Sequence, residues 1–423
     1  MTMLDVPAIA GHDLALAAPA ILRDPVVYDG LDAEWPFGGS TEGLSEHLSL
    51  RGPRPSAHGS HGSDLVDALE RAGLTGRGGA HVPSHLKWRA AVAAGPGGIV
   101  VVNGAEGEPA SAKDAALLQL RPHLVLDGAA LAAQAIQARE VVLWVHGACR
   151  STLARIDEAL CERRAAGVDD PPMRVVLAPD AYVAGESSSV ISALQGGSPL
   201  PRFSRDRARP WGEGPAILVH NAETHARVAL LARGVLPETS LLTFAETSSP
   251  LYVARRTVVE VPETQTLGET LRSLALPVPQ AVLLGGYSGT WLAWEDAERL
   301  PVSASGLAAE SLSLGAGVVL LLPQGRDGAR EAAEITAYLA EQSAQQCGPC
   351  VFGLPELASS MREWARARAK RRGSRASRLA SRRERRSQQR LDPLAELLRG
   401  RGACRHPDGV VRMALSAREV FGS

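Results

Sequence analysis

The sequence has 423 residues, of which 45% are hydrophobic, and its formal net charge is −1. This length exceeds what one ordinary hydrophobic core supports, so we expect two or three packed domains. The longest apolar stretches, such as 315–323, are too short to cross a bilayer, and the N-terminus lacks the basic start of a secretory signal. Five cysteines in a chain this long suit a reducing compartment rather than a secreted disulfide framework. We therefore predict a cytoplasmic protein, at most peripheral to a membrane complex.

The N-terminal half carries the pattern of an α/β domain. Residues 1–62 are rich in Gly, Pro, Ser and His and lack sustained periodicity, which predicts an irregular N-terminal segment. Residues 63–245 alternate helical patterns with short apolar stretches that predict strands, namely 97–104, 140–146, 174–179 and 216–220. Strands that alternate with helices predict an α/β sandwich with a mostly parallel sheet.

The C-terminal half changes character twice. Residues 246–303 combine a β-rich stretch at 253–262 with a short helical pattern at 267–274, which predicts a small α+β module. Residues 304–423 contain a clear helical pattern at 329–345 and are predicted to form a helical domain that carries three cysteines.

A glycine-rich loop, GLTGRGGAHVPSHLKW, lies between two predicted helices at 73–88. Glycine lets backbone amides approach an anion closely, and a helix N-terminus adds partial positive charge that favours phosphate. Lys87 adds a full positive charge near the end of the loop. The motif therefore indicates a phosphate site, with a tight turn between helices as the simpler alternative.

A polar turn follows the strand predicted at 97–104. Ligands in open α/β sheets bind at the carboxyl ends of strands, which is where this turn lies. The turn therefore predicts a second part of the same ligand site, with a solvated acidic turn as the alternative. Its polar residues are Asn103, Glu106, Glu108, Lys113 and Asp114.

The two motifs together are far more specific than either alone. In order and spacing they resemble the GRGGAG-F-P-x-G-x-K-W and N-x-D-E-G-E-P-G-x-x-K-D signatures of the FMN- and NADH-binding flavoprotein subunit of complex I. That family includes hydrogenase and formate dehydrogenase flavoprotein subunits. The likeness continues through 181–197 (AYVAGESSSVISALQGG) and 221–224 (NAET), and it covers about residues 64–421. The β-rich module is similar to the family's ubiquitin-like SLBB domain, and the helical end is similar to its iron–sulfur bundle.

The resemblance implies an oxidoreductase subunit that depends on flavin. Family members accept hydride from NADH on FMN and pass single electrons to a [4Fe-4S] cluster. The implied cofactors are FMN and an iron–sulfur cluster, with NAD(P)H as substrate. Glu108 corresponds to the glutamate that contacts the nicotinamide nucleotide. The residues implied to bind flavin or nucleotide are Gly76, Arg77, Gly78, Gly79, Lys87, Asn103, Glu106, Glu108, Gly185, Glu186, Asn221 and Thr224.

The sequence departs from the family pattern around the nucleotide. The family's Gly-Phe-Pro is His81-Val82-Pro83 here, so the aromatic ring that stacks on NADH is absent. Stacking contributes about 0.5–1.5 kcal/mol beyond burial, so we expect weaker nucleotide binding unless Trp211 compensates.

Two carboxylates of the family pattern are also absent, because Ala105 and Ser187 stand in their places. Less negative charge raises the flavin potential or favours a more anionic nucleotide. We therefore hypothesise that NADPH is oxidised at least as well as NADH.

The cluster motif is incomplete. The family's three closely spaced cysteines and a later fourth appear here as Ala344, Cys347, Cys350 and Cys404, whereas a [4Fe-4S] cluster usually takes four thiolates. Three explanations stay open at this point: His406 is the fourth ligand, the site holds a three-iron cluster, or it holds a four-iron cluster with one open iron. So do zinc on three cysteines and His406, and loss of the cluster with Cys347 and Cys350 kept for packing or as a redox pair.

The stretch 362–390 holds thirteen Arg or Lys residues against Glu363 and Glu384, which gives it a charge of +11 and leaves −12 for the rest. Such a run predicts a solvated helix or a disordered insertion. Its charge alternatively steers an acidic redox partner, such as a ferredoxin or another subunit of an electron-transfer complex. Trp364 is its single aromatic residue, so nucleic acid is not an expected partner.

The leading functional hypothesis is an NAD(P)H-oxidising flavoprotein that feeds electrons through an iron–sulfur cluster to a protein partner. The alternative is a non-catalytic electron-relay or scaffold subunit that has kept the fold and lost nucleotide binding. A third possibility is membrane anchoring through the basic stretch.

Overall fold

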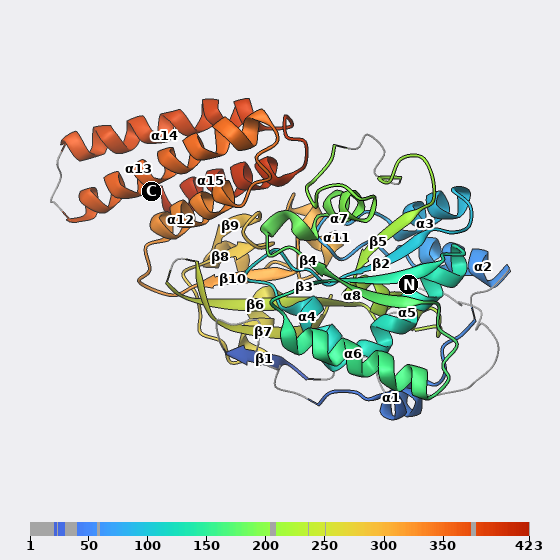
Figure 1. The fold of residues 1–423 in the computed structure, drawn as a ribbon. Coiled ribbons are helices and arrows are strands. Elements are labelled where there is room, and N and C mark those ends of the chain that lie inside the picture. The colour runs from blue at the N-terminus through green and yellow to red at the C-terminus, as the bar shows by residue number, and fades with distance from the viewer. Residues whose placement is uncertain are drawn as a thin grey trace.

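A parallel sheet of four strands, in the order β4-β3-β2-β5, forms the centre of the first domain in the computed structural model (Figure 1). The structure describes residues 21–422 apart from 23, 30–39, 57–59, 204–208, 236, 250 and 374–377. The strands are β2 (Ile99–Asn103), β3 (Glu140–His146), β4 (Met173–Ala178) and β5 (Ile217–Asn221). Side chains of β2, β3 and β5 are buried on both faces, as in a parallel sheet covered by helices.

Helices cover this sheet, so the predicted α/β sandwich is confirmed. Helices α5 and α8 pack against each other and against β2. Gly128 of α5 lies so close to α8 that a Cβ there would overlap the His225 carbonyl oxygen. The helices are α2 (Ser60–Arg71), α3 (Ser84–Ala93), α4 (Lys113–Leu120), α5 (Pro122–Ala135), α6 (Arg150–Ala165), α7 (Ser187–Leu194) and α8 (Ala222–Leu231), with a 3₁₀ turn at Tyr182–Gly185.

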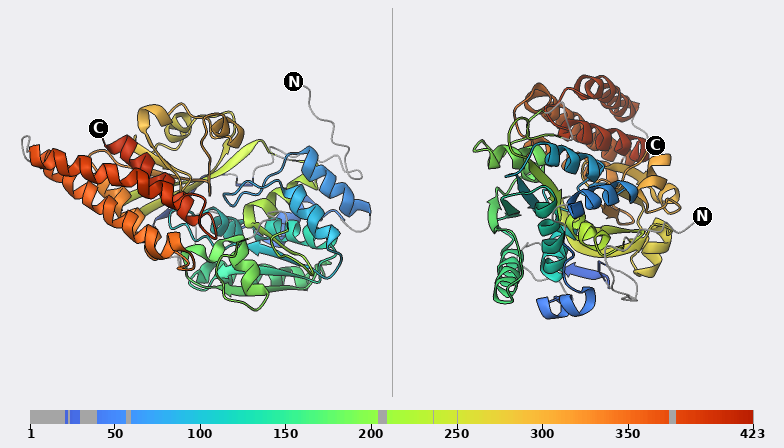
Figure 2. Two further views of the ribbon diagram at one scale, coloured as in Figure 1. Left: turned by 90° about the horizontal axis from the view of Figure 1, so that it is seen from above. Right: turned by 90° about the vertical axis from the view of Figure 1, so that its right-hand side faces the viewer.

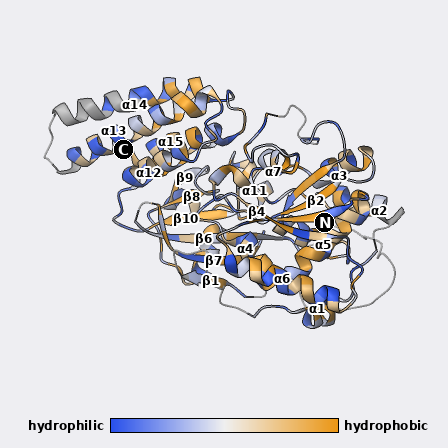
Figure 3. Ribbon diagram, viewed as in Figure 1, coloured by the Kyte–Doolittle hydropathy of each residue, from blue (hydrophilic) through white to orange (hydrophobic). Residues whose placement is uncertain are grey.

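A second sheet, in the order β1-β7-β6-β10-β8-β9, packs beside the first domain. Strand β10 runs parallel to β6 and antiparallel to β8. In Figure 3 the central strands β2 and β10 are coloured as hydrophobic, in keeping with their burial. The strands are β1 (Val26–Asp29), β6 (Thr239–Ser249), β7 (Tyr252–Pro262), β8 (Ala281–Leu284), β9 (Thr290–Ala293) and β10 (Val318–Leu322), and the module's helices are α9 (Leu267–Ser273), α10 (Trp294–Ala297) and α11 (Ala304–Ala309).

This sheet reaches beyond the predicted module of 246–303 at both ends. Strand β10 lies within the segment 304–423 that was assigned to the helical domain, and its sequence VVLLL explains the difference. A short apolar run that is buried on both faces has no periodicity to distinguish strand from helix. The likeness of the module to an SLBB domain stays a prediction.

The segment 1–62 is more regular than predicted where the structure describes it. Strand β1 pairs antiparallel with β7, and helix α1 (Leu44–Arg51) packs against α5 and α6. The partners of both elements lie far away in the sequence, so no local pattern announces them. Residues 1–20 lie outside the described part.

Four helices form the C-terminal bundle, which projects to one side of the molecule (Figure 2). They are α12 (Gly328–Glu341), α13 (Leu354–Gly373), α14 (Arg378–Leu398) and α15 (His406–Phe421), with a π-helical turn at Pro349–Gly353. The basic stretch is helical at 362–373 and 378–390, where α13 and α14 pack together, and 374–377 lie outside the described residues. Among the described helices, none is long and apolar enough to span a membrane.

The contact between α5 and α8 makes a stability prediction. Gly128→Ala places a methyl group 1.8 Å from the His225 carbonyl oxygen, so the helices must move apart. We expect the free energy of unfolding to fall by about 3 kcal/mol, as in overpacked cores. Urea denaturation measures this, with Gly147→Ala as control, because the nearest atom to a Cβ there is a Leu177 methyl at 3.9 Å. Equal stability of the two variants would contradict the packing.

Candidate flavin and nucleotide site

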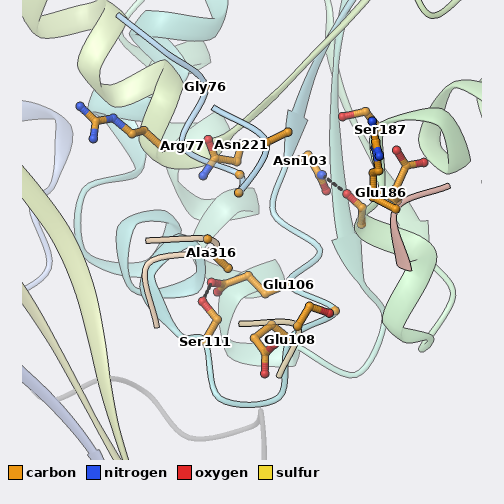
Figure 4. A pocket seen from close by; sticks show the side chains of 18 of the residues that line it. Gly76, Arg77, Asn103, Glu106, Glu108, Ser111, Glu186, Ser187, Asn221 and Ala316 are labelled. Atoms are coloured by element: carbon orange, nitrogen blue, oxygen red, sulfur yellow. Dashed lines mark hydrogen bonds between the residues drawn. The ribbon is translucent and has the colours of Figure 1, made fainter. Parts of the chain in front are cut away.

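A cavity of about 410 Å³ opens at the carboxyl ends of β2 and β5. All twelve residues predicted to bind flavin or nucleotide line it, although they come from four separate parts of the sequence. Figure 4 shows Gly76 and Arg77 of the glycine loop, Asn103 and Asn221 at the strand ends, and Glu186 gathered around this space. Asn103 and Asn221 are paired in register on adjacent parallel strands, which is why the two motifs meet.

The glycine loop is fixed to the start of α8. The Arg77 backbone N–H donates to Thr224 Oγ1 at 2.9 Å, and Thr224 in turn bonds to the Asn221 side chain that caps α8. Gly79 has a φ of 101°, a conformation that favours glycine, and a Cβ there would meet the Gly315 carbonyl carbon at 3.4 Å. The loop therefore presents backbone rather than side chains to the cavity.

A buried ionic network forms the floor of the cavity. The Asp114 carboxylate accepts hydrogen bonds from Asn221 Nδ2 at 3.0 Å and from the Glu223 backbone N–H at 2.9 Å. Lys113 Nζ lies 3.2 Å from Asp114 and 3.0 Å from Glu223. Burial works against the charge on Glu223, but Lys113 and Arg227 hold its pKa down to about 2. The network locks the turn after β2 to the end of β5.

Two cations beside the glycine loop are poorly satisfied. Lys87 is half-buried, and its Nζ lies 3.4 Å from the Val219 carbonyl oxygen, a long hydrogen bond. Burial lowers the pKa of Lys87. Arg77 has a buried Nε without a partner among the described residues, and its guanidinium is 3.9 Å from Glu263. The Arg77 side chain points away from the cavity (Figure 4), so a bound anion would satisfy Lys87, and this end of the cavity fits a phosphate.

The opposite wall is acidic. Glu108 accepts hydrogen bonds from the Tyr287 N–H at 2.7 Å, the Ala110 N–H at 3.3 Å and Tyr182 Oη at 3.3 Å. Burial nevertheless raises the pKa of Glu108 to about 7. Burial and the nearby Asp114 carboxylate raise the pKa of Glu106, which bonds to Ser111 (Figure 4).

Part of the lining comes from elements that the sequence motifs did not reveal. Tyr182 bonds to Ser288 of the β8–β9 turn at 3.1 Å, which ties the second module to the cavity. A Cβ at Gly286 would overlap the Glu108 carboxylate. The additional lining residues from the second module and the helical bundle are Gly285, Ser288, Gly315, Ala316, Cys404, Arg405, His406, Gly409 and Arg412. Their separation in sequence from the two motifs left no signal to find them.

Trp211 does not compensate for the missing aromatic ring. It is buried in the core of the first domain and is not part of the cavity lining. His81 and Val82 do line the cavity, and His81 has a φ of 47° where the family carries glycine. The possibility that Trp211 compensates for the missing ring is therefore excluded, because its indole packs into the core.

The three predicted cluster cysteines lie together beside the cavity. Burial opposes ionisation of Cys347, but hydrogen bonds from the Ala403 backbone and from Cys350 lower its pKa. Burial raises the pKa of Cys350 to about 12 and also raises the pKa of Cys404, and both thiols lie close enough to Cys347 to interact electrostatically. Within the described residues, no three His, Cys, Asp or Glu side chains are arranged around a single metal ion. Three thiols are one fewer than the four that a [4Fe-4S] cluster usually takes.

Two family descriptions match this chain, one for each end. Residues 69–230 match the Nuo51 FMN-binding domain, and residues 330–423 match the NADH-ubiquinone oxidoreductase-F iron–sulfur binding region. The chain belongs to the family of complex I flavoprotein subunits.

Members of this family from several bacteria resemble the chain over most of its length. An NADH-quinone oxidoreductase subunit of Rhizobium meliloti is 25% identical over 79% of this chain and 83% of that protein. The corresponding subunit of the Streptomyces coelicolor enzyme is 28% identical over 71% of each. One chain of an NAD⁺-reducing [NiFe]-hydrogenase has the same fold, with a TM-score of 0.72 and 24% identity. The match covers 90% of this chain but 65% of that one.

The raised pKa of Glu108 predicts how stability depends on pH. An ordinary carboxyl pKa near 4.5 in the unfolded chain and about 7 in the folded chain means that stability present below pH 4.5 is lost as the pH rises through 7. Glu108→Gln should remove this loss, which is about 3 kcal/mol.

Unfolding free energies of wild type and Glu108→Gln between pH 4.5 and 8 measure the difference. Glu310→Gln, at an exposed position, is the matched control. A wild-type profile parallel to that of Glu108→Gln would contradict the buried, protonated carboxyl.

Proposed function

We propose that this chain oxidises NAD(P)H with bound FMN and passes the electrons through an iron–sulfur cluster to a protein partner. One observation carries the proposal: twelve residues of four sequence segments meet in one cavity, where the poorly satisfied Lys87 faces an acidic wall. Bound FMN supplies the means to take two electrons together and release them singly. The chain itself supplies binding, orientation and charge.

The glycine loop and Lys87 would hold the flavin phosphate. Gly78 and Gly79 line the cavity without Cβ atoms, whereas the amides of Gly76 and Arg77 already donate to Val82 and Thr224, and Lys87 lines the same cavity. Asn103 and Asn221 at the strand ends would contact the rest of the flavin. The Asn103 side chain is already oriented by donating to the Gly185 carbonyl at 2.7 Å, so little ordering is needed on binding.

Glu108 and Glu186 would face the nicotinamide nucleotide. Glu186 caps α7 by accepting the Ser188 N–H at 2.8 Å and the Ser189 N–H at 3.2 Å, which fixes its carboxylate at the rim. Ser187 follows where the family has a second glutamate. The cavity therefore has one carboxylate fewer here than the family pattern, so it repels the additional phosphate of NADPH less.

The segments that carry the thiols expose a surface suited to a partner. Cys404 lines the cavity, while Phe352 is 77% exposed in the turn that follows Cys350. Exposed arginines follow on the neighbouring loop at Arg399, Arg401 and Arg405. An apolar contact within a positive rim suits a redox protein with an acidic face, and the basic α13–α14 pair would add to its attraction.

Flavin binding is the first test. The full chain prepared anaerobically should bind FMN and bleach when NADH or NADPH is added, whereas a scaffold without nucleotide binding would stay yellow.

Lys87→Gln should raise the Kd for FMN about 10- to 100-fold, because one charge-assisted hydrogen bond is lost. Fluorescence titration measures the Kd, with Lys370→Gln as control, because Lys370 is exposed and outside the cavity lining. Failure of the full chain to bind FMN would contradict the proposal.

Nucleotide preference tests the missing carboxylates. Wild type should use NADPH at least as well as NADH, and Ser187→Glu should lower the ratio of kcat/KM for NADPH over NADH about tenfold, as one nearby charge would. Ser187→Gln controls for side-chain size. Strict NADH preference in wild type, or equal ratios in the two variants, would count against this account.

A further inference from the structure

His406 lies close in sequence to the incomplete set of cysteines, and one nitrogen of its ring has an unused lone pair. It follows Cys404 by two residues and is 8% exposed. The His406 backbone N–H bonds to the Cys404 thiol, so the two residues share one corner of the fold. Ala344 occupies the place of the family's first cysteine, so one position around the thiols lacks a protein ligand.

The hydrogen bonding of His406 fixes which ring nitrogen is free. Nε2 lies 2.8 Å from the Leu339 carbonyl oxygen. A carbonyl oxygen only accepts hydrogen bonds, so Nε2 carries the hydrogen and Nδ1 of the neutral ring keeps a bare lone pair. Nδ1 is buried and has no hydrogen-bond partner among the described residues. A buried acceptor left unused costs about 1–3 kcal/mol, so a role as a helix cap alone leaves this nitrogen unexplained.

The His406 ring also lies near the chain segment that contains Ala344, where the family's first cysteine is missing. Leu339 belongs to the last turn of α12, where carbonyl groups lack partners within the helix. Three residues after α12 ends at Glu341, the chain reaches Ala344. On its other side the imidazole packs against Tyr182, with ring centroids 5.4 Å apart, at the wall of the flavin cavity.

We propose that His406 Nδ1 is the fourth ligand of the iron–sulfur cluster, completing Cys347, Cys350 and Cys404 in place of the thiolate missing at Ala344. An Nε2–H donated to a backbone carbonyl, with the other nitrogen free, is the arrangement that orients histidines bound to metals. Exchange of a thiolate for a neutral imidazole makes the site less negative and raises the potential of the cluster. The inference rests on the proposed function in requiring that the chain bind the cluster.

Pulsed EPR on the reduced full-length protein, prepared anaerobically with ¹⁵N-labelled histidine, tests the bond directly. A directly bound imidazole gives a strong nitrogen coupling that changes with the label. His406→Ala should lose this coupling and fall from four irons per chain to three. His406→Cys should lose the coupling and keep four irons, as should the double variant Ala344→Cys/His406→Ala, which restores the family's cysteine set.

A purely structural His406 would make His406→Ala less stable while its iron content stayed unchanged, and wild type would show no such coupling. Either result overturns the proposal. Wild type without iron overturns it too, but FMN binding and bleaching by NAD(P)H would then still stand. Conversely, a coupling present in a chain that refuses FMN would uphold the ligand and defeat the proposed function.

Discussion

The Asp114 carboxylate holds the two halves of the site together. It accepts hydrogen bonds from Asn221 at the end of β5 and sits in the turn that leaves β2, with Lys113 and Glu223 as ionic partners. Breaking one partner of a buried network leaves an uncompensated charge, which costs about 3–5 kcal/mol. The position of the glycine loop depends on this floor, because the loop is bonded to Thr224 one helical turn beyond Asn221.

The cavity draws on all parts of the fold. The first domain supplies the glycine loop and strand ends, the second module supplies the turn at Ser288, and the bundle supplies Cys404 and His406. The Tyr182 hydroxyl joins Glu108 to Ser288 and its ring packs on His406, so one side chain contacts residues from each part. This convergence places the thiols beside the cavity, as passage of electrons from flavin to cluster requires.

The sequence predicted the polar residues of the site better than the residues that enclose the cavity. Asn103 and Asn221 were predictable because polar residues after buried strands gather at one sheet edge. Gly315 and Ser288 were not, since contacts between distant segments leave no local periodicity. The α/β sandwich followed from its alternating pattern, whereas β10 was hidden by its continuous apolar sequence. The position of Trp211 was not predictable, because its alignment with a family residue does not determine the direction of its side chain.

The departures at Ala105, Ser187 and Ala344 leave the architecture intact and remove two carboxyl groups and one thiol of the family pattern. The central claim is that the cavity above Asp114 is filled by flavin. The most direct measurement is the amount of FMN released by denaturing the full chain, prepared anaerobically with FMN and washed free of excess. We predict about one FMN per chain, as a single pre-formed pocket would hold. Flavin far below that amount would contradict the account.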